Sequence, residues 1–292
     1  MKGIILTGGK GTRLYPASKT INKGLLPVYD KPMIYYPLST LMLSGIKDIL
    51  VIASERDIKR FKELLEDGSH LGLSISYEIE YETIGIGNAF ILGEKFIGND
   101  DVCLVLGDNI FYGHKLPMML KDSVREVKEN KNSVVFGYYV QDPKRFGVVE
   151  FDEKKTAISL EEKPDNPKSN YAVVGLYYYT NDVVNISKSL KPSERGELEI
   201  TDINREYLNK NRLTVQLLGR GHAWLDTGTH QTLLEASSFI GMIESRQGWK
   251  ISCIEEIAFR MGYISSNDLK ALSKSYNNEY GEYLLKVSKI SL

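Results

Sequence analysis

The sequence has little cysteine and histidine, and each shortage excludes a class of protein. Its 292 residues include two cysteines, Cys103 and Cys253, which lie far apart and form no Cys-x-x-Cys pair. Two isolated cysteines predict a protein without disulfides, as is usual in the reducing cytoplasm. The four histidines show no spacing typical of zinc ligands, so we expect no zinc site.

Long apolar runs and an excess of either charge are also missing. With 37 basic and 38 acidic side chains the net charge is −1, which argues against binding of nucleic acid or an anionic membrane through bulk charge. No apolar stretch reaches the roughly 18 residues that a transmembrane helix needs. Residues 1–3 run directly into a short apolar stretch without the features of a secretion signal. We therefore expect a cytoplasmic protein with no nucleic-acid or membrane partner.

The first half of the chain alternates short apolar runs with amphipathic stretches. This pattern predicts strands at residues 3–6, 49–53, 73–77 and 102–106, and helices at about 33–44, 56–65 and 88–96. Such alternation is typical of an α/β fold with a parallel sheet and helices on both faces. The ligand site of such a fold lies beyond the carboxyl ends of the strands.

The second half has a different pattern. Residues 146–151, 157–160 and 171–179 are rich in β-forming side chains, which predicts a strand-rich lobe on the same sheet. No proline follows Pro192, and Leu233, Ala236, Ile240 and Ile243 recur at helical spacing. We therefore expect the last sixty or so residues to form a helical appendage.

A glycine-rich loop follows the first predicted strand. Its three glycines in residues 8–13 let backbone N–H groups approach a phosphate, and Arg13 and Lys23 add positive charge. The loop does not match the P-loop pattern. It also departs from the dinucleotide-binding pattern, because Leu14 replaces the third glycine and Pro16 interrupts the expected helix. A mobile glycine turn and an exposed lysine remain the alternatives.

Three carboxylates are candidates for binding a metal or a sugar, and two of them come after predicted strands. Asp108 follows the buried run 102–106 after Gly107, and Asp226 is the second candidate for binding Mg²⁺ together with phosphate. Glu162 and Lys163 follow the run 157–160 and are suited to sugar hydroxyls and a sugar phosphate. A turn aspartate and a solvated charged turn are the structural alternatives.

Seven motifs in order resemble the sugar-1-phosphate nucleotidyltransferases, most closely the members that transfer a thymidylyl group. The motifs are KGIIL (2–6), GGxGTRL (8–14), LLPVYDKPMIYYP (25–37), LGDN (106–109), LEEKP (160–164), GELEITD (196–202) and WLDTGTH (224–230). Each motif alone is weak, but the ordered set is specific and spans essentially the whole chain.

The resemblance implies a fold and an assembly. It implies a Rossmann-like, mostly parallel mixed sheet flanked by helices, with a strand-rich sugar-binding lobe and a C-terminal helical appendage. The catalytic core would span residues 1–228, with nucleotide binding in 1–110 and sugar binding in about 111–228. Residues 229–292 would make the contacts of a homotetramer and contribute to allosteric control by a nucleotide sugar.

The resemblance also implies roles for individual residues. The expected reaction is Mg²⁺-dependent transfer of a nucleoside monophosphate from dTTP to glucose 1-phosphate, with release of pyrophosphate, as in the synthesis of dTDP-glucose and dTDP-rhamnose. The catalytic residues would be Arg13, Lys23, Asp108, Lys163 and Asp226, of which Asp108 and Asp226 would bind the metal. The nucleotide would contact Leu6, Gly8, Gly9, Gly11, Thr12, Arg13, Lys23, Glu80, Gly85 and Asp108. The sugar phosphate would contact Asn109, Gly147, Glu162, Lys163, Tyr171 and Val173.

Two positions depart from the thymine-reading pattern of these relatives. Gly24 and Glu80 stand where thymidylyltransferases usually have glutamine. An ionised carboxylate only accepts hydrogen bonds, whereas a glutamine amide both donates and accepts. Three explanations are open. Glu80 is protonated and acts like glutamine, a backbone N–H donates to thymine O4 in its place, or the enzyme uses another nucleotide. A carboxylate suits the adjacent donors of guanine, Gly24 would leave extra room, and residues 84–89 also resemble the loop of uridylyltransferases.

Two rival classes fit the sequence less well. A nicotinamide-dependent oxidoreductase would need the dinucleotide-binding loop that is missing here. A non-catalytic nucleotide-sugar sensor would be expected to lack the charged residues, yet Arg13, Lys23, Asp108, Lys163 and Asp226 are all present.

Overall fold

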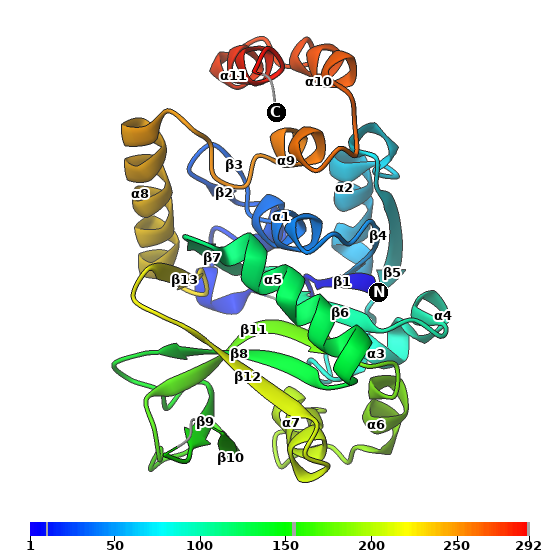
Figure 1. Ribbon diagram of the computed structural model, residues 1–292, viewed down its shortest axis with the longest axis vertical. Coiled ribbons are helices and arrows are strands. Elements are labelled where there is room, and N and C mark those ends of the chain that lie inside the picture. Colours follow the sequence, from blue (N-terminus) through cyan, green and yellow to red (C-terminus); the bar gives the residue numbers. More distant parts are fainter. Residues whose placement is uncertain (10, 154–155, 291–292) are drawn as a thin grey trace.

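The centre of the molecule is a mixed β-sheet. The computed structural model describes residues 1–9, 11–153 and 156–290, and within these ranges the sheet has nine strands (Figure 1). The strand order is β10-β9-β11-β6-β1-β4-β5, with β8 beside β11 and β12 beside β8. The strands are β1 (Lys2–Leu6), β4 (Asp48–Ala53), β5 (Ser74–Ile79), β6 (Val102–Leu106), β8 (Ser133–Tyr139), β9 (Gly147–Phe151), β10 (Ala157–Glu162), β11 (Tyr171–Tyr179) and β12 (Leu213–Leu218). Strands β10 and β11 run in one direction and the other strands of the sheet run in the opposite direction. The sheet is therefore mixed but mostly parallel.

Helices cover both faces of this sheet, as the sequence predicted. One face packs against α1 (Tyr35–Leu43), α2 (Glu55–Leu65), α5 (Leu116–Arg125) and α9 (Ile254–Arg260). The other face packs against α3 (Asn88–Leu92), α4 (Glu94–Ile97), α6 (Val183–Ser189) and α7 (Ile200–Asn209). Successive strand residues alternate between the two cores, since Ile4 belongs to one and Ile5 to the other. The predicted Rossmann-like α/β fold is therefore confirmed.

The predicted elements of the first half are present, with one difference. The four strands and the first two helices match within about two residues. The single helix predicted at 88–96 is instead two short helices, α3 and α4, which meet at Gly93. Glycine is a weak helix former, and a side chain at Gly93 would lie 2.9 Å from the Ala89 carbonyl oxygen and 3.0 Å from the Ile4 side chain. Close packing on the sheet explains both the glycine and the break.

The middle of the chain contains the predicted strands and further ones that the sequence pattern did not indicate. The runs at 146–151, 157–160 and 171–179 correspond to β9, β10 and β11. The additional strands are β7 (Asn109–Gly113), β8, β12 and β13 (His222–Asp226). Strands β7 and β13 pair antiparallel with each other, more than a hundred residues apart in sequence. This pairing matters for the site, because it places Asp226 opposite Asn109.

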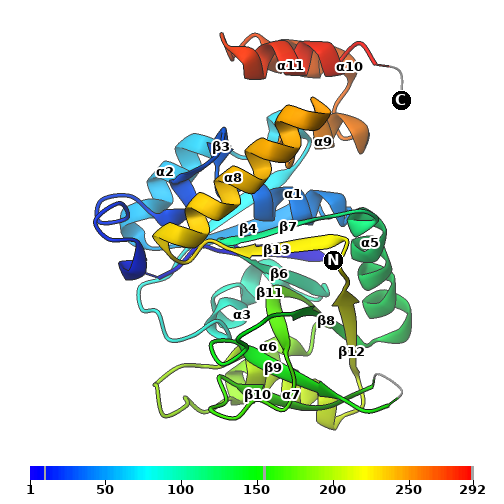
Figure 2. The same cartoon turned by 90° about the vertical axis from the view of Figure 1, so that its left-hand side faces the viewer.

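The C-terminal part is helical, as predicted. It consists of α8 (His230–Gln247), α9, α10 (Ser266–Ser273) and α11 (Glu279–Val287), and α10 and α11 lie at the far end from the strand-rich lobe (Figure 2). The buried face of α8 packs on the small hairpin of β2 (Pro27–Val28) and β3 (Lys31–Pro32). No helix within the described ranges is long and apolar enough to cross a membrane.

Candidate active site

A cavity of about 510 Å³ opens beyond the carboxyl ends of β1 and β6, where an α/β sheet binds its ligand. Segments from both halves of the core contribute to its walls. The lining residues are Arg13, Ile86, Leu106, Asp108, Asn109, Lys144, Arg145, Phe146, Gly147, Glu162, Lys163, Val173, Gly175, Tyr177, Ile200, Thr201, Trp224 and Asp226. The cavity therefore combines polar, charged and aromatic groups suited to a phosphorylated, hydroxylated ligand.

Asp108 lies in the turn between β6 and β7 and is held by two neighbours. The Lys23 ammonium, from the short helix η2 (Lys23–Leu25), donates to its Oδ2 atom, and Asn109 Nδ2 donates to its Oδ1 atom at 3.0 Å. Burial alone would raise the pKa of Asp108. The positive charge and hydrogen bond of Lys23 outweigh burial, so the pKa lies below its usual value and the group is a carboxylate.

Asp226 faces the same cavity from the end of β13. Burial raises its pKa, and the negative charge of Asp108 raises it further, while Lys23, Arg13 and Arg145 act in the opposite direction. A side chain at Gly228 would lie 3.1 Å from Asp226 Oδ1 and 3.2 Å from Arg13 Nη2. The lack of a side chain at Gly228 thus lets the Arg13 guanidinium approach Asp226.

The two aspartates have the chemistry of a divalent-cation site. They repel each other across one cavity, and hard oxygen ligands are those that Mg²⁺ prefers. Within the described ranges no group of three or more His, Cys, Asp or Glu side chains is placed to hold a metal. Two carboxylates leave the remaining coordination positions to water and phosphate oxygens, as is usual for Mg²⁺ bound with a nucleotide.

The strand-rich lobe supplies a second group of polar residues. Glu162, at the end of β10, accepts a hydrogen bond from Thr201 Oγ1 at 2.5 Å and lies 3.5 Å from Lys163 Nζ. Gly147 is opposite Glu162 in the sheet, and a side chain there would lie 2.9 Å from Thr201 Oγ1. Lys163 itself has a left-handed backbone, with φ of +43°, and its N–H donates to Phe146 O at 3.0 Å. This turn points the lysine and the carboxylate into one cavity.

Asn109 is fixed by two hydrogen bonds from distant segments. Its Oδ1 atom accepts from Trp224 Nε1 at 2.6 Å and from Gly175 N at 3.1 Å. The Trp224 ring in turn packs edge-on against Phe146, with ring centroids 5.1 Å apart. These contacts join β7, β11 and β13 around the cavity. The Trp224 and Phe146 rings form an aromatic part of the cavity wall.

The glycine loop and Glu80 form a second region beside the cavity. The Glu80 carboxylate packs directly on Gly8, since a side chain at Gly8 would lie 1.8 Å from Glu80 Oε2. Gly9 and Gly11 have φ values of +89° and +59°, which favour glycine. Glu80 is 5% exposed, and burial raises its pKa even though Thr83 donates a hydrogen bond to it. The protonated form of Glu80 is therefore favoured to a higher pH than in an exposed glutamate.

Gly24 does not open free space. A side chain at this position would lie 3.3 Å from the Phe61 ring and 3.2 Å from Asn22 Oδ1, so the expected extra room is already occupied. Gly85 also packs tightly, because a side chain there would lie 2.5 Å from Leu198 N. Backbone hydrogen bonds from Leu198 N to Ile84 O and from Gly87 N to Leu198 O join the two segments.

The structure brings most of the predicted site residues together. Eight of them line the cavity: Arg13, Asp108, Asn109, Gly147, Glu162, Lys163, Val173 and Asp226. Lys23 joins them through Asp108, and Leu6, Gly8, Gly9, Gly11 and Thr12 form the end of β1, the loop and the start of the short helix η1 (Thr12–Leu14). Tyr171 lies outside the cavity lining, and its ring packs on Tyr139 and Phe151 instead.

Other lining residues were not assigned a role from the sequence. Thr201 and Trp224 lie within matched motifs, so the motif itself was an available signal. Lys144 and Arg145 follow Pro143 in a turn, and no residue pattern distinguishes them from solvated surface charges. Their place in the cavity depends on how the turn between β8 and β9 folds back toward Asp226.

The family of the chain follows from its sequence as well as its geometry. The profile of the nucleotidyl transferase family matches residues 2–242. The chain belongs to this family, whose members transfer nucleotidyl groups. Its cavity, with two carboxylates facing several cations, has a chemistry that suits the transfer of an anionic nucleotidyl group.

Among its relatives are several proteins named glucose-1-phosphate thymidylyltransferase. The Neisseria meningitidis protein is 56% identical over 290 residues, which cover 99% of this chain and 100% of that protein. The Mycobacterium tuberculosis protein is 53% identical and covers 98% of this chain and 99% of its own length. The similarity therefore includes the C-terminal helices as well as the core.

Solved structures show the same fold. A Bacillus anthracis protein described as a candidate glucose-1-phosphate thymidylyltransferase, in complex with a sucrose, has a TM-score of 0.75 and 42% identity, covering 82% of this chain and 94% of that one. A UDP-glucose pyrophosphorylase complexed with UDP-glucose has a TM-score of 0.74 and 26% identity, covering 83% and 98%.

Proposed function

We propose that this protein transfers a thymidylyl group from dTTP to α-D-glucose 1-phosphate and releases pyrophosphate. The observation that carries the proposal is that Asp108 and Asp226 line the same cavity as Arg13 and Lys163. Two anionic substrates can meet there because cationic groups offset their repulsion. Full-length similarity to proteins named for this reaction supports the choice of substrates.

The residues act by binding and orientation. A phosphate oxygen of the sugar phosphate attacks the α-phosphorus, a new P–O bond forms, and the bond to the β-phosphate breaks with its electron pair leaving on pyrophosphate. Arg13 and Lys23 are placed to hold the nucleotide phosphates, and Lys163 the sugar phosphate. Because both reactants are anions, the main task of the site is positioning and charge stabilisation.

Asp108 and Asp226 would hold Mg²⁺, whose bound form supplies charge neutralisation to the phosphates. The fit rests on two carboxylates that line one cavity, with no group of three His, Cys, Asp or Glu side chains placed to bind a metal in the described ranges. The test is removal of divalent ions with a chelator. We expect pyrophosphate release to stop and to return when Mg²⁺ is added, whereas activity that persists in the chelator would contradict the metal site.

The base preference depends on Glu80. A buried, protonated carboxyl group can donate to thymine O4 and accept from thymine N3–H, as a glutamine would. The raised pKa and the close packing on Gly8 support this form. The alternatives are UTP and GTP, the latter if Glu80 is ionised and accepts from the adjacent guanine donors.

Parallel assays with dTTP, UTP, GTP and CTP on glucose 1-phosphate test both the reaction and the base. We expect pyrophosphate release to be fastest with dTTP. A profile dominated by GTP would overturn the thymidylyl assignment but keep the reaction class. Binding of nucleotide without pyrophosphate release from any of the four would favour the non-catalytic sensor.

We also propose the setting in which the protein works. Its two cysteines are free and buried, which supports the cytoplasm as its location. The core would divide near residues 110 and 228, with residues 229–292 contributing to a homotetramer under feedback control by a nucleotide sugar. Support for the last boundary is that residues 229–290 hold helices α8 to α11 and, in this described stretch, no strand.

A further inference from the structure

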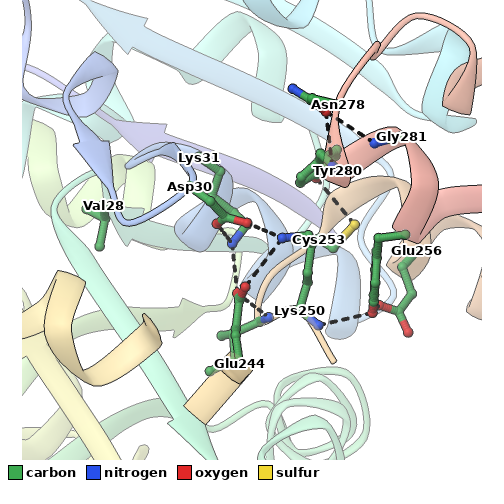
Figure 3. Close-up of polar contacts among 12 residues, drawn as sticks. Val28, Asp30, Lys31, Glu244, Lys250, Cys253, Glu256, Asn278, Tyr280 and Gly281 are labelled. Atoms are coloured by element: carbon green, nitrogen blue, oxygen red, sulfur yellow. Dashed lines mark hydrogen bonds and ion pairs between the residues drawn. The ribbon is translucent and has the colours of Figure 1, made fainter. Parts of the chain in front are cut away.

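A cluster of four charges, two of them buried, joins the β2–β3 hairpin to the end of α8 (Figure 3). Lys31 contacts Asp30 and lies 3.0 Å from Glu244 Oε1, and the Lys31 and Glu244 side chains are 1% and 6% exposed. Lys250 contacts the same Asp30 and lies 3.5 Å from Glu244 Oε2. We call Asp30, Lys31, Glu244 and Lys250 the charge cluster. Two lysines and two carboxylates make it neutral overall.

Stability alone does not explain this arrangement. Buried ion pairs lose much of their attraction to desolvation, and apolar replacements are often neutral or stabilising. Such a cluster is better explained by its effect on geometry. Each charge must stay beside its opposite charge, which fixes the position of the segments that carry them. Glu244 is restrained further by the Ile251 N–H, which donates to its Oε1 atom at 2.8 Å. The cluster therefore holds the hairpin in one position against α8.

The hairpin is directly connected to the segment that carries Lys23. The chain enters the hairpin from η2 and then returns alongside it, with Ile34 N donating to Gly24 O and Met33 N donating to Leu26 O, both at 2.9 Å. The Lys23 side chain reaches from η2 to Asp108. A displacement of the hairpin would therefore displace the Lys23 ammonium.

The other side of the cluster is connected to the second aspartate. Helix α8 begins four residues after Asp226 and packs, together with the hairpin, in one apolar core that also contains Ile110 of β7. Thr227, next to Asp226, donates to the Asp108 carbonyl oxygen at 2.8 Å and contacts Met33 Sδ at 3.1 Å. The hairpin and α8 thus support the two sides of the same cation–carboxylate group.

We propose that Lys31 and Glu244 are positioning residues, which hold the Lys23 ammonium against Asp108 by fixing the hairpin on α8. Neither residue lines the cavity, so they act through Lys23 and not on the substrate. The inference rests on the proposed function for its kinetic test, but the placement of Lys23 is measurable without turnover.

The main test is the double variant Lys31→Met/Glu244→Gln. It removes one charge of each sign, leaves the Asp30–Lys250 pair, and keeps an acceptor for the Ile251 N–H. We expect its thermal unfolding midpoint to stay close to that of the wild type while kcat falls about 10- to 100-fold, with KM for both substrates changed less than about threefold. Glu244→Gln alone should show a smaller effect in the same direction. Glu63→Gln, which removes a carboxylate 3.9 Å from Lys59 in an exposed pair, is the matched control and should behave as wild type.

A second readout follows the amine itself. Acetylation of lysines by a limiting amine reagent, quantified by peptide mass spectrometry, should modify Lys23 several times faster in the double variant, relative to the exposed Lys59 in the same sample. Wild-type kcat together with wild-type Lys23 labelling in the double variant would overturn the inference. If the wild-type protein released no pyrophosphate from any nucleotide, the proposed function would fail, and the labelling ratio would still decide the role of the cluster.

Discussion

Residues of one type behave differently in this site because their neighbours differ. Asp108 and Asp226 line the same cavity, yet the pKa of Asp108 is lowered by Lys23 and that of Asp226 is raised by burial and by Asp108. A cation that enters between them relieves this repulsion. The repulsion between the two carboxylates supports the proposed Mg²⁺ site.

Lys163 should be needed for turnover and not for folding. Its side chain is 43% exposed in the cavity wall, beside Glu162. Lys163→Ala removes a cation from the sugar-phosphate region and should lower kcat about 10²–10³-fold in the pyrophosphate-release assay, with an unchanged unfolding midpoint. Lys168→Ala, which removes an exposed lysine paired with Glu161, is the control. Turnover of Lys163→Ala at the wild-type level would remove this residue from the mechanism.

Glu80 should make stability depend on pH in a defined direction. The pKa of Glu80 in the folded state lies above the ordinary value of 4.5. The contribution of Glu80 to the free energy of unfolding is therefore fully present below pH 4.5 and is lost as the pH rises through the folded-state pKa. Glu80→Gln has no charge to bury. Its free energy of unfolding, measured with denaturant, should match the wild type near pH 4 and exceed it increasingly toward pH 7.

The control for this experiment is Glu82→Gln, in an exposed position of the same segment. It should give the wild-type pH dependence. An advantage of Glu80→Gln that is constant with pH would mean that burial does not disfavour the ionised form. If the neutral carboxyl is the form that reads thymine, Glu80→Gln should also keep the preference for dTTP.

At the scale of elements, short segments between strands connect two sides of the cavity. The loop 84–87 is joined to Leu198 by backbone hydrogen bonds, and Leu198 is followed closely by Thr201, which binds Glu162. The loop 84–87 and the part of the cavity wall around Glu162 are therefore linked through the segment from Leu198 to Thr201. The closest point of this contact is at Gly85, where a side chain would collide with the Leu198 backbone, so only glycine fits.

Gly85→Ala tests this contact. Gly85 has φ of +108°, and an added methyl group would lie 2.5 Å from Leu198 N, so we expect a loss of about 2–4 kcal/mol in the free energy of unfolding and a raised KM for both substrates. Gly45→Ala is the matched control, because Gly45 also has positive φ, +83°, but no atom within 4 Å. It should cost only about 1 kcal/mol and leave KM unchanged. Equal effects of the two variants would attribute the loss to backbone strain alone.

At the scale of the whole molecule, the C-terminal helices expose apolar side chains that suit contacts between subunits. Leu234 and Met242 on α8 are 62% and 56% exposed. We expect light scattering to give a mass of four times the 33.0 kDa chain, and Leu234→Asp to shift the mass toward smaller species. Ile158→Asp, at an exposed apolar position of β10, should leave the mass unchanged. A monomeric wild-type protein would contradict the tetramer.

Local patterns in the sequence predict much of this architecture. The alternating strands and helices around β1, β4, β5 and β6, the helical period of α8 and the glycines of the loop all follow from periodicity and backbone freedom, which act between near neighbours in the chain. The motif resemblance named eight of the residues that line the cavity. These features need no knowledge of which distant segments meet.

What depends on distant segments could not be obtained this way. The pairing of β7 with β13, the entry of Lys144 and Arg145 into the cavity, the packing of Glu80 on Gly8 and the filling of space at Gly24 by Phe61 each join residues far apart in the chain. The opposite pKa shifts of Asp108 and Asp226 arise from the same cause. Burial and charge proximity are properties of the packed molecule, and a linear pattern of residues contains neither.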